Sequence, residues 1–191
     1  MLHAFGCSFT YGTSCVNPQK DSWPILLSNM LNMDCKNYGL SGASNDYIFK
    51  TLSENLNAFT LQDVIVIMMT KPSRRYIREN NILPNSHNEM AKIYYKYIND
   101  QQGDCINFLQ NLNAYHYILK DYRYLITFID ATILLECNEH KLGAVARQKQ
   151  NVYIPKKLSF DRYIQDVDNL HPSNKGHQQI AQELFEGNFN A

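Results

Sequence analysis

Hydrophobic positions along the chain fall first into short continuous runs. Such runs, bounded by polar or turn residues, are typical of buried strands. They cover residues 2–5, 64–69 and 124–129, with a weaker run at 34–38. The run at 64–69 contains no polar residue, as expected of a central parallel strand that is buried on both faces.

Between these runs, apolar residues recur at spacings of three and four, which predicts amphipathic helices. The predicted helices begin after residue 22, run from about 46 to 59, cover 90–98 and 104–119, and follow a Ser173 cap. The rest of 76–103 is predicted to be loop, and 131–165 an insertion or active-site wall. Alternating strands and helices predict one α/β domain over residues 1–191, with a parallel sheet between two layers of helices. Its functional loops then follow the strands, at 6–12, 39–45 and 70–75.

Composition narrows the classes of function. The 191 residues include 18 basic and 18 acidic side chains, and this neutral balance argues against a nucleic-acid partner. No segment approaches the roughly 20 apolar residues of a membrane span, and the amino terminus has no signal-peptide pattern. We therefore expect a cytoplasmic protein without membrane association.

Five cysteines without a CxxC pair favour reduced thiols over disulfides or a zinc site, and we expect no metal or cofactor. The Asn-rich, Ala-poor composition would suit a phage or an AT-rich bacterium.

A serine stands directly after the first predicted strand, in the segment Phe5-Gly6-Cys7-Ser8-Phe9-Thr10-Tyr11-Gly12. A hydroxyl exposed on such a tight turn becomes a nucleophile once a base removes its proton. An ordinary strand-to-helix turn has the same pattern, so the motif alone is weak evidence. Cys7 is an alternative nucleophile, but as the neighbour of Ser8 it should point to the other side of the chain.

A carboxylate and an imidazole stand three residues apart near the carboxyl end, in Asp168-Asn169-Leu170-His171-Pro172. The carboxylate can hold one ring nitrogen, which leaves the other as a general base. Of the six histidines, His171 is the one with such a partner at short range. The plain alternative is a surface histidine at the start of a capped helix.

A glycine-containing loop, residues 39–45, lies between a predicted strand and a helix. Backbone N–H groups in such a loop, aided by the helix dipole, can bind an oxyanion. The alternative is a loop that simply requires glycine dihedral angles.

The three motifs, in this order, resemble the SGNH (GDSL-type) hydrolase superfamily, with a Gly-Cys-Ser-Phe-Thr variant of its first block. The resemblance implies that Ser8 is the nucleophile, that Gly42 belongs to the oxyanion hole, and that Asp168 and His171 complete the triad. It also implies a flavodoxin-like three-layer α/β/α sandwich. The expected activity is ester hydrolysis, in which the N–H groups of Ser8 and Gly42 bind the oxyanion.

The third block of the family is missing. The family has Gly-X-Asn-Asp after the central strand, where this chain has Met69-Thr70-Lys71-Pro72. The candidates for the lost oxyanion donor are Asn45 and Thr70. The loss also favours an alternative function, that of a catalytically degenerate binding or regulatory protein on the same scaffold.

A basic segment follows the third block. Lys71 and Arg74 can hold an anionic group on a substrate, although charge runs are usually solvated turns. With Arg75 and Arg78 they could also contact nucleic acid, which the neutral net charge argues against. The expected substrate is a small-molecule or glycan ester, with a small acyl group such as acetyl on a polar or carbohydrate carrier.

Overall fold

A computed structural model describes residues 1–84, 87–132, 134, 151–155, 159–160, 163–164 and 170–189. Most of the predicted insertion at 131–165 lies outside these described residues. So does Asp168, the predicted triad carboxylate.

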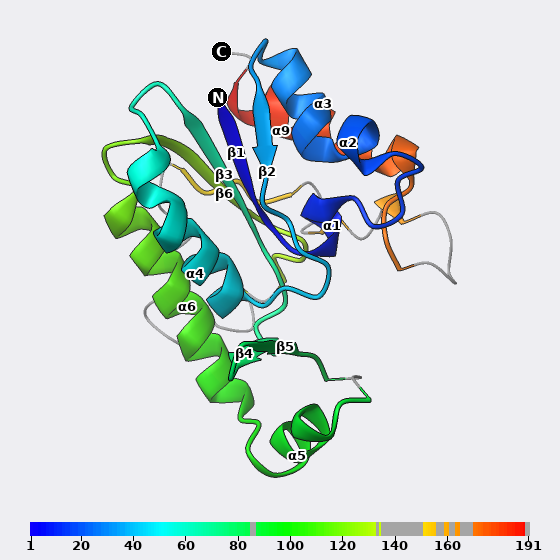
Figure 1. Ribbon diagram of the computed structural model, residues 1–191, viewed down its shortest axis with the longest axis vertical. Coiled ribbons are helices and arrows are strands. Elements are labelled where there is room, and N and C mark those ends of the chain that lie inside the picture. Colours follow the sequence, from blue (N-terminus) through cyan, green and yellow to red (C-terminus); the bar gives the residue numbers. More distant parts are fainter. Residues whose placement is uncertain are drawn as a thin grey trace.

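Four parallel strands form the central sheet in the order β2-β1-β3-β6 (Figure 1). The strands are β1 (Leu2–Gly6), β2 (Cys35–Asn37), β3 (Val64–Met69) and β6 (Arg123–Phe128). Every residue of β3 is buried, which confirms the predicted central strand. Beyond β6, Val152 makes one parallel bridge to Ile126.

Helices pack on both faces of the sheet, which confirms the predicted three-layer α/β architecture. They are α1 (Ser8–Tyr11), α2 (Pro18–Asp21), α3 (Trp23–Met30), α4 (Asn45–Asn55), the 3-10 turn η1 (Leu56–Ala58), α5 (Glu89–Tyr97), α6 (Gln101–Ile118) and α9 (Asn174–Asn188). Figure 1 shows α4 and α6 on one side of the sheet and α3 and α9 on the other. None of the helices within the described ranges is long and apolar enough to cross a bilayer.

Side-chain caps define where the main helices begin. Ser44 accepts a hydrogen bond from the N–H of Tyr47 at the start of α4. Ser173 caps α9 in the same way, as predicted. Asp100 caps α6, which therefore starts three residues before the predicted position. Such caps satisfy backbone N–H groups that have no partner within the helix.

The main difference from prediction is a two-stranded hairpin in the segment predicted to be loop. Strands β4 (Arg75–Ile77) and β5 (Asn80–Ile82) pair antiparallel. The two turn residues, Arg78 and Glu79, have φ angles of 46° and 64°. Glycine or asparagine normally occupies such positions. Because this turn has arginine and glutamate instead, its sequence did not predict a hairpin. The predicted helix to residue 59 is also too long, because α4 ends at Asn55.

Candidate functional site

Strand β1 places Ser8 at the carboxyl edge of the sheet. Ser8 is the first residue of α1, and its side chain is buried at 3% exposure. Gly6 pairs with Met68 of β3, so Ser8 and Thr70 each lie two residues past this pair, at the same edge. The turn requires glycine at position 6, because a Cβ there would lie 2.0 Å from the Thr10 hydroxyl oxygen.

Cys7 has a different environment from Ser8. Its side chain is fully buried in the hydrophobic core. The Ser8 hydroxyl still approaches the Cys7 sulfur at 3.9 Å, a long and weak contact. Core burial makes Cys7 a poor candidate for a nucleophile, which needs an accessible thiolate.

The glycine loop packs directly against α1. A Cβ at Gly39 would lie 2.4 Å from the backbone nitrogen of Tyr11, so this position admits no side chain. Asn37 Nδ2 donates to the Thr10 carbonyl at 2.7 Å and fixes the approach. Gly42 needs glycine for another reason, since its φ is +80°.

The two predicted oxyanion donors are backbone N–H groups, one at the start of α1 and one in the glycine loop. Within the described part of the chain, the N–H groups of Ser8 and Gly42 donate to no protein acceptor. Unpaired N–H groups beside a nucleophile are what an oxyanion hole requires. That Ser8 and Gly42 form an oxyanion hole stays a prediction, and their unpaired N–H groups are compatible with it.

The two candidates for the missing donor have different surroundings, although both are 2% exposed. The Asn45 amide pairs with the backbone of Thr70, accepting from its N–H and donating to its carbonyl, both at 2.9 Å. The Thr70 hydroxyl is buried and has no hydrogen-bond partner among the described residues. Asn45 therefore joins the glycine loop to the loop after β3. The Thr70 hydroxyl is the polar group that has no partner among the described residues.

The carboxy-terminal motif meets α1 through His171. Its ring packs on the ring of Phe9, the residue after Ser8, with centroids 6.0 Å apart and planes tilted by 54°. Burial lowers the pKa of His171, and the nearby charge of Arg74 lowers it further. The imidazole is therefore neutral at pH 7, the form that accepts a proton.

No hydrogen bond joins Ser8 to His171, both of which are described residues. Such bonds between nucleophile and base are often long in free enzymes and tighten when substrate binds. The role predicted for Asp168 falls on a residue outside the described ranges.

His177, six residues further on, anchors the fold. Its side chain is fully buried, and Nδ1 accepts the backbone N–H of Trp23 at 3.2 Å. Burial lowers its pKa to about 4, so the ring is neutral and joins α9 to α3. Across the described ranges, no three His, Cys, Asp or Glu side chains gather where they could hold a metal ion.

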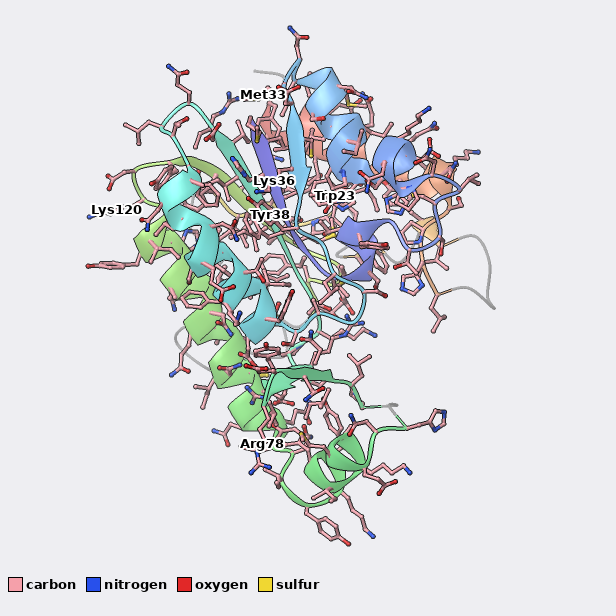
Figure 2. The ribbon with its side chains drawn as sticks, in the orientation of Figure 1. Trp23, Met33, Lys36, Tyr38, Arg78 and Lys120 are labelled. Carbon is pink, nitrogen blue, oxygen red and sulfur yellow. The ribbon has the colours of Figure 1, made fainter. Side chains whose placement is uncertain are left out.

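The structure separates the members of the basic segment. Arg75 forms an ion pair with buried Asp104 at 2.7 Å. Arg78 lies exposed in the β4–β5 turn, and Figure 2 shows it in the part of the molecule formed by β4, β5 and α5. Lys71 is exposed and lines a cavity of about 490 Å³ together with Asp104 and Asp130.

Arg74 points the other way, toward the glycine loop. Its guanidinium donates to the Ala43 carbonyl at 3.4 Å. Ala43 directly follows Gly42 in the chain. The charge of Arg74 also lowers the pKa of His171. Of the two predicted substrate-binding cations, Arg74 is thus the one that contacts the glycine loop, and its charge lowers the pKa of His171.

Sequence reasoning missed two residues that hold the site loops. Asn81 of β5 accepts from both the N–H and the hydroxyl of Ser44, at 2.9 and 3.1 Å. The hydroxyl of Tyr95 in α5 donates to the Ser73 carbonyl. The hairpin and α5 therefore support both loops. Neither residue belongs to a recognisable motif, so no sequence signal could have found them.

Comparisons with known proteins identify the fold. No family model and no curated protein matches the sequence. Solved structures do match. One is a lipolytic protein of the G-D-S-L family from Veillonella parvula, with 15% identity, TM-score 0.57 and coverage of 100% of this chain and 98% of that chain. The esterase EstA from Pseudoalteromonas has 10% identity, TM-score 0.58 and coverages of 97% and 94%. The acetyl xylan esterase AlAXEase has 12% identity, TM-score 0.60 and coverages of 98% and 99%. This chain therefore has the fold of the SGNH (GDSL-type) hydrolases.

Proposed function

We propose that this protein is a serine esterase with Ser8 as its nucleophile. The observation that carries the proposal is the meeting of three segments at α1. Buried Ser8 begins α1, the Gly42 loop packs on its backbone, and His171 packs on Phe9 in a neutral state. Acyl transfer requires a hydroxyl, unpaired N–H groups and a base close to one another, and the meeting of these segments supports the proposal.

The mechanism follows from these groups. Ser8 Oγ attacks the ester carbonyl while His171 takes its proton, and Asp168 is proposed to hold the histidine tautomer. The N–H groups of Ser8 and Gly42 stabilise the oxyanion, with the Thr70 hydroxyl as third donor. His171 then protonates the leaving alcohol and activates a water molecule, which releases the acid and restores Ser8. Each oxyanion donor contributes about 3 kcal/mol to transition-state binding in hydrolases where one was removed.

A small acyl group on a polar or carbohydrate carrier is the proposed substrate. An acetyl xylan esterase is among the proteins of similar fold, which agrees with this choice.

A fluorophosphonate probe tests the nucleophile. The wild type should be labelled, Ser8→Ala should not, and Ser41→Ala should label like the wild type. Ser41 is a matched control because it is an exposed serine on the Gly42 loop. Turnover of para-nitrophenyl acetate should disappear in His171→Ala. Equal labelling of Ser8→Ala would refute the serine mechanism.

The second candidate is a binding protein on the same scaffold. The observation that favours it is the Thr70-Lys71-Pro72 sequence where the family places its oxyanion asparagine. A wild type that neither reacts with the probe nor turns over short esters, while remaining folded by circular dichroism, would favour this candidate over the esterase.

A further inference from the structure

The backbone around Arg74 holds this residue in one place. The N–H of Arg74 donates to the Lys71 carbonyl at 3.2 Å and closes a turn directly after Thr70. The Tyr95 hydroxyl binds the carbonyl of the preceding residue, Ser73. Arg74 is therefore a half-buried side chain on a fixed turn, unlike a cation on a free surface loop.

The guanidinium of Arg74 is poorly satisfied. An arginine presents five N–H donors, and with the described residues this one makes a single hydrogen bond, of 3.4 Å, to the Ala43 carbonyl. Among the described residues, Arg74 has no carboxylate partner.

The nearby acidic side chains are already engaged by other groups. Asp104 pairs with Arg75. Asp46 accepts hydrogen bonds from the Tyr76 N–H and from the amides of Asn107 and Asn111. Within the described ranges, one arginine of the turn is thus paired with a buried carboxylate and its neighbour is not.

The position of this unpaired charge relates it to the proposed chemistry. The carbonyl that Arg74 contacts belongs to the residue after Gly42, in the loop that packs on α1. The charge of Arg74 also lowers the pKa of His171. The cation therefore contacts the proposed oxyanion loop and lies within electrostatic range of the proposed base.

We propose that Arg74 binds an anionic group of the ester substrate, a carboxylate, phosphate or sulfate, beside the scissile acyl group. This inference rests on the esterase function proposed above and names the class of its substrate. A half-buried cation is unfavourable without a counter-charge, and the planar fork of arginine matches such anions with two parallel hydrogen bonds. The carrier of the acyl group is then a polar molecule with a negative charge close to the ester.

Two matched pairs of esters test the charge preference. On the acyl side, para-nitrophenyl hemisuccinate is compared with para-nitrophenyl pentanoate. On the alcohol side, meta-acetoxybenzoate is compared with its methyl ester. In at least one pair, the wild type should prefer the anionic member. Arg74→Gln should lower kcat/KM for that member about 10- to 100-fold, mainly through KM, while the neutral member changes less than about 3-fold.

Two further variants serve as controls. Arg78→Gln removes an exposed cation at the β4–β5 turn and should leave both kcat/KM values unchanged. Arg74→Lys keeps the charge without the fork and should recover part of the preference.

The outcomes separate this inference from the proposed function. Ser8-dependent turnover of neutral esters, with no charge preference or with equal loss of both members in Arg74→Gln, overturns the role of Arg74 in anion binding and leaves the esterase intact. Absence of Ser8-dependent turnover for every ester refutes the esterase and this inference with it.

Discussion

The loop after β1 and the loop after β3 end at the same edge of the sheet, yet they are built in different ways. The first, residues 7–12, carries its proposed chemistry in one residue, Ser8, within a local motif. The second, residues 70–75, is held by groups from other elements: the Asn45 amide from α4, the Tyr95 hydroxyl from α5 and the Asp104 carboxylate from α6. The comparison teaches that the proposed nucleophile belongs to a local motif, while the neighbouring loop is held by groups from distant parts of the chain.

Burial explains why the second loop needs these supports. Desolvation raises the pKa of Asp104, and the ion pair with Arg75 opposes that shift. A buried carboxylate of this kind is stable only with its partner. The β4–β5 hairpin supplies that partner, so the shape of the loop depends on an element that lies outside the family motifs.

The largest expected effect tests the first loop. Ser8→Ala should reduce kcat for para-nitrophenyl acetate by a factor of about 10⁴ or more, because triad residues act as a unit. The midpoint of urea unfolding should stay close to that of the wild type. Activity within tenfold of the wild type would show that the first loop does not carry the nucleophile.

Asn45→Ala tests the assembly of the second loop. It leaves the buried N–H and carbonyl of Thr70 without partners, so the free energy of unfolding should fall by about 3 kcal/mol in urea titrations. Asn55→Ala is the matched control. Its amide donates to the Thr51 carbonyl at the end of α4, partly exposed, and its loss should cost less than about 1 kcal/mol. Equal effects of the two changes would contradict the joining role of Asn45.

Thr70→Val asks whether the second loop supplies the missing oxyanion donor. Because the hydroxyl has no partner among the described residues, its removal should leave the free energy of unfolding within about 1 kcal/mol of the wild type. As a lost oxyanion donor, it should lower kcat about 100-fold. Unchanged kcat with unchanged stability would assign the donor to another group.

The smallest effect concerns pH and couples the two loops. Neutral His171 is the proposed base, so kcat/KM should rise with pH through the pKa of this residue. Burial and the Arg74 charge both lower that pKa, so the midpoint should lie below the ordinary imidazole value of 6.5. Arg74→Gln removes the second cause and should move the midpoint upward by less than one pH unit, measured with a neutral ester. A downward shift would contradict the placement of Arg74 near His171.

The strands of the central sheet and the β4–β5 hairpin differ in how far the sequence predicts them. The strands β1, β3 and β6 were predicted because continuous apolar runs reflect burial on both faces, which is independent of the partner strands. The β4–β5 hairpin was missed because its strands are only three residues long and its turn places Arg78 and Glu79 at positive φ. Its stability comes from contacts with distant elements, such as that of Asn81 with Ser44, which no local pattern records.

The sequence by itself determined the architecture and the candidates: a parallel α/β sheet, Ser8 after its first strand, and glycines at positions where a side chain is excluded or φ is positive. These are local properties, because apolar periodicity and backbone dihedral angles belong to neighbouring residues. Only the tertiary structure decided that Arg74 is the cation of the basic segment that contacts the glycine loop. It also decided that the Asn45 amide binds the backbone of Thr70, while the Thr70 hydroxyl has no hydrogen-bond partner among the described residues. Those outcomes depend on which buried polar groups find partners across the fold. Pairing of this kind is set by packing between elements that lie from about 25 to more than 30 residues apart in the chain.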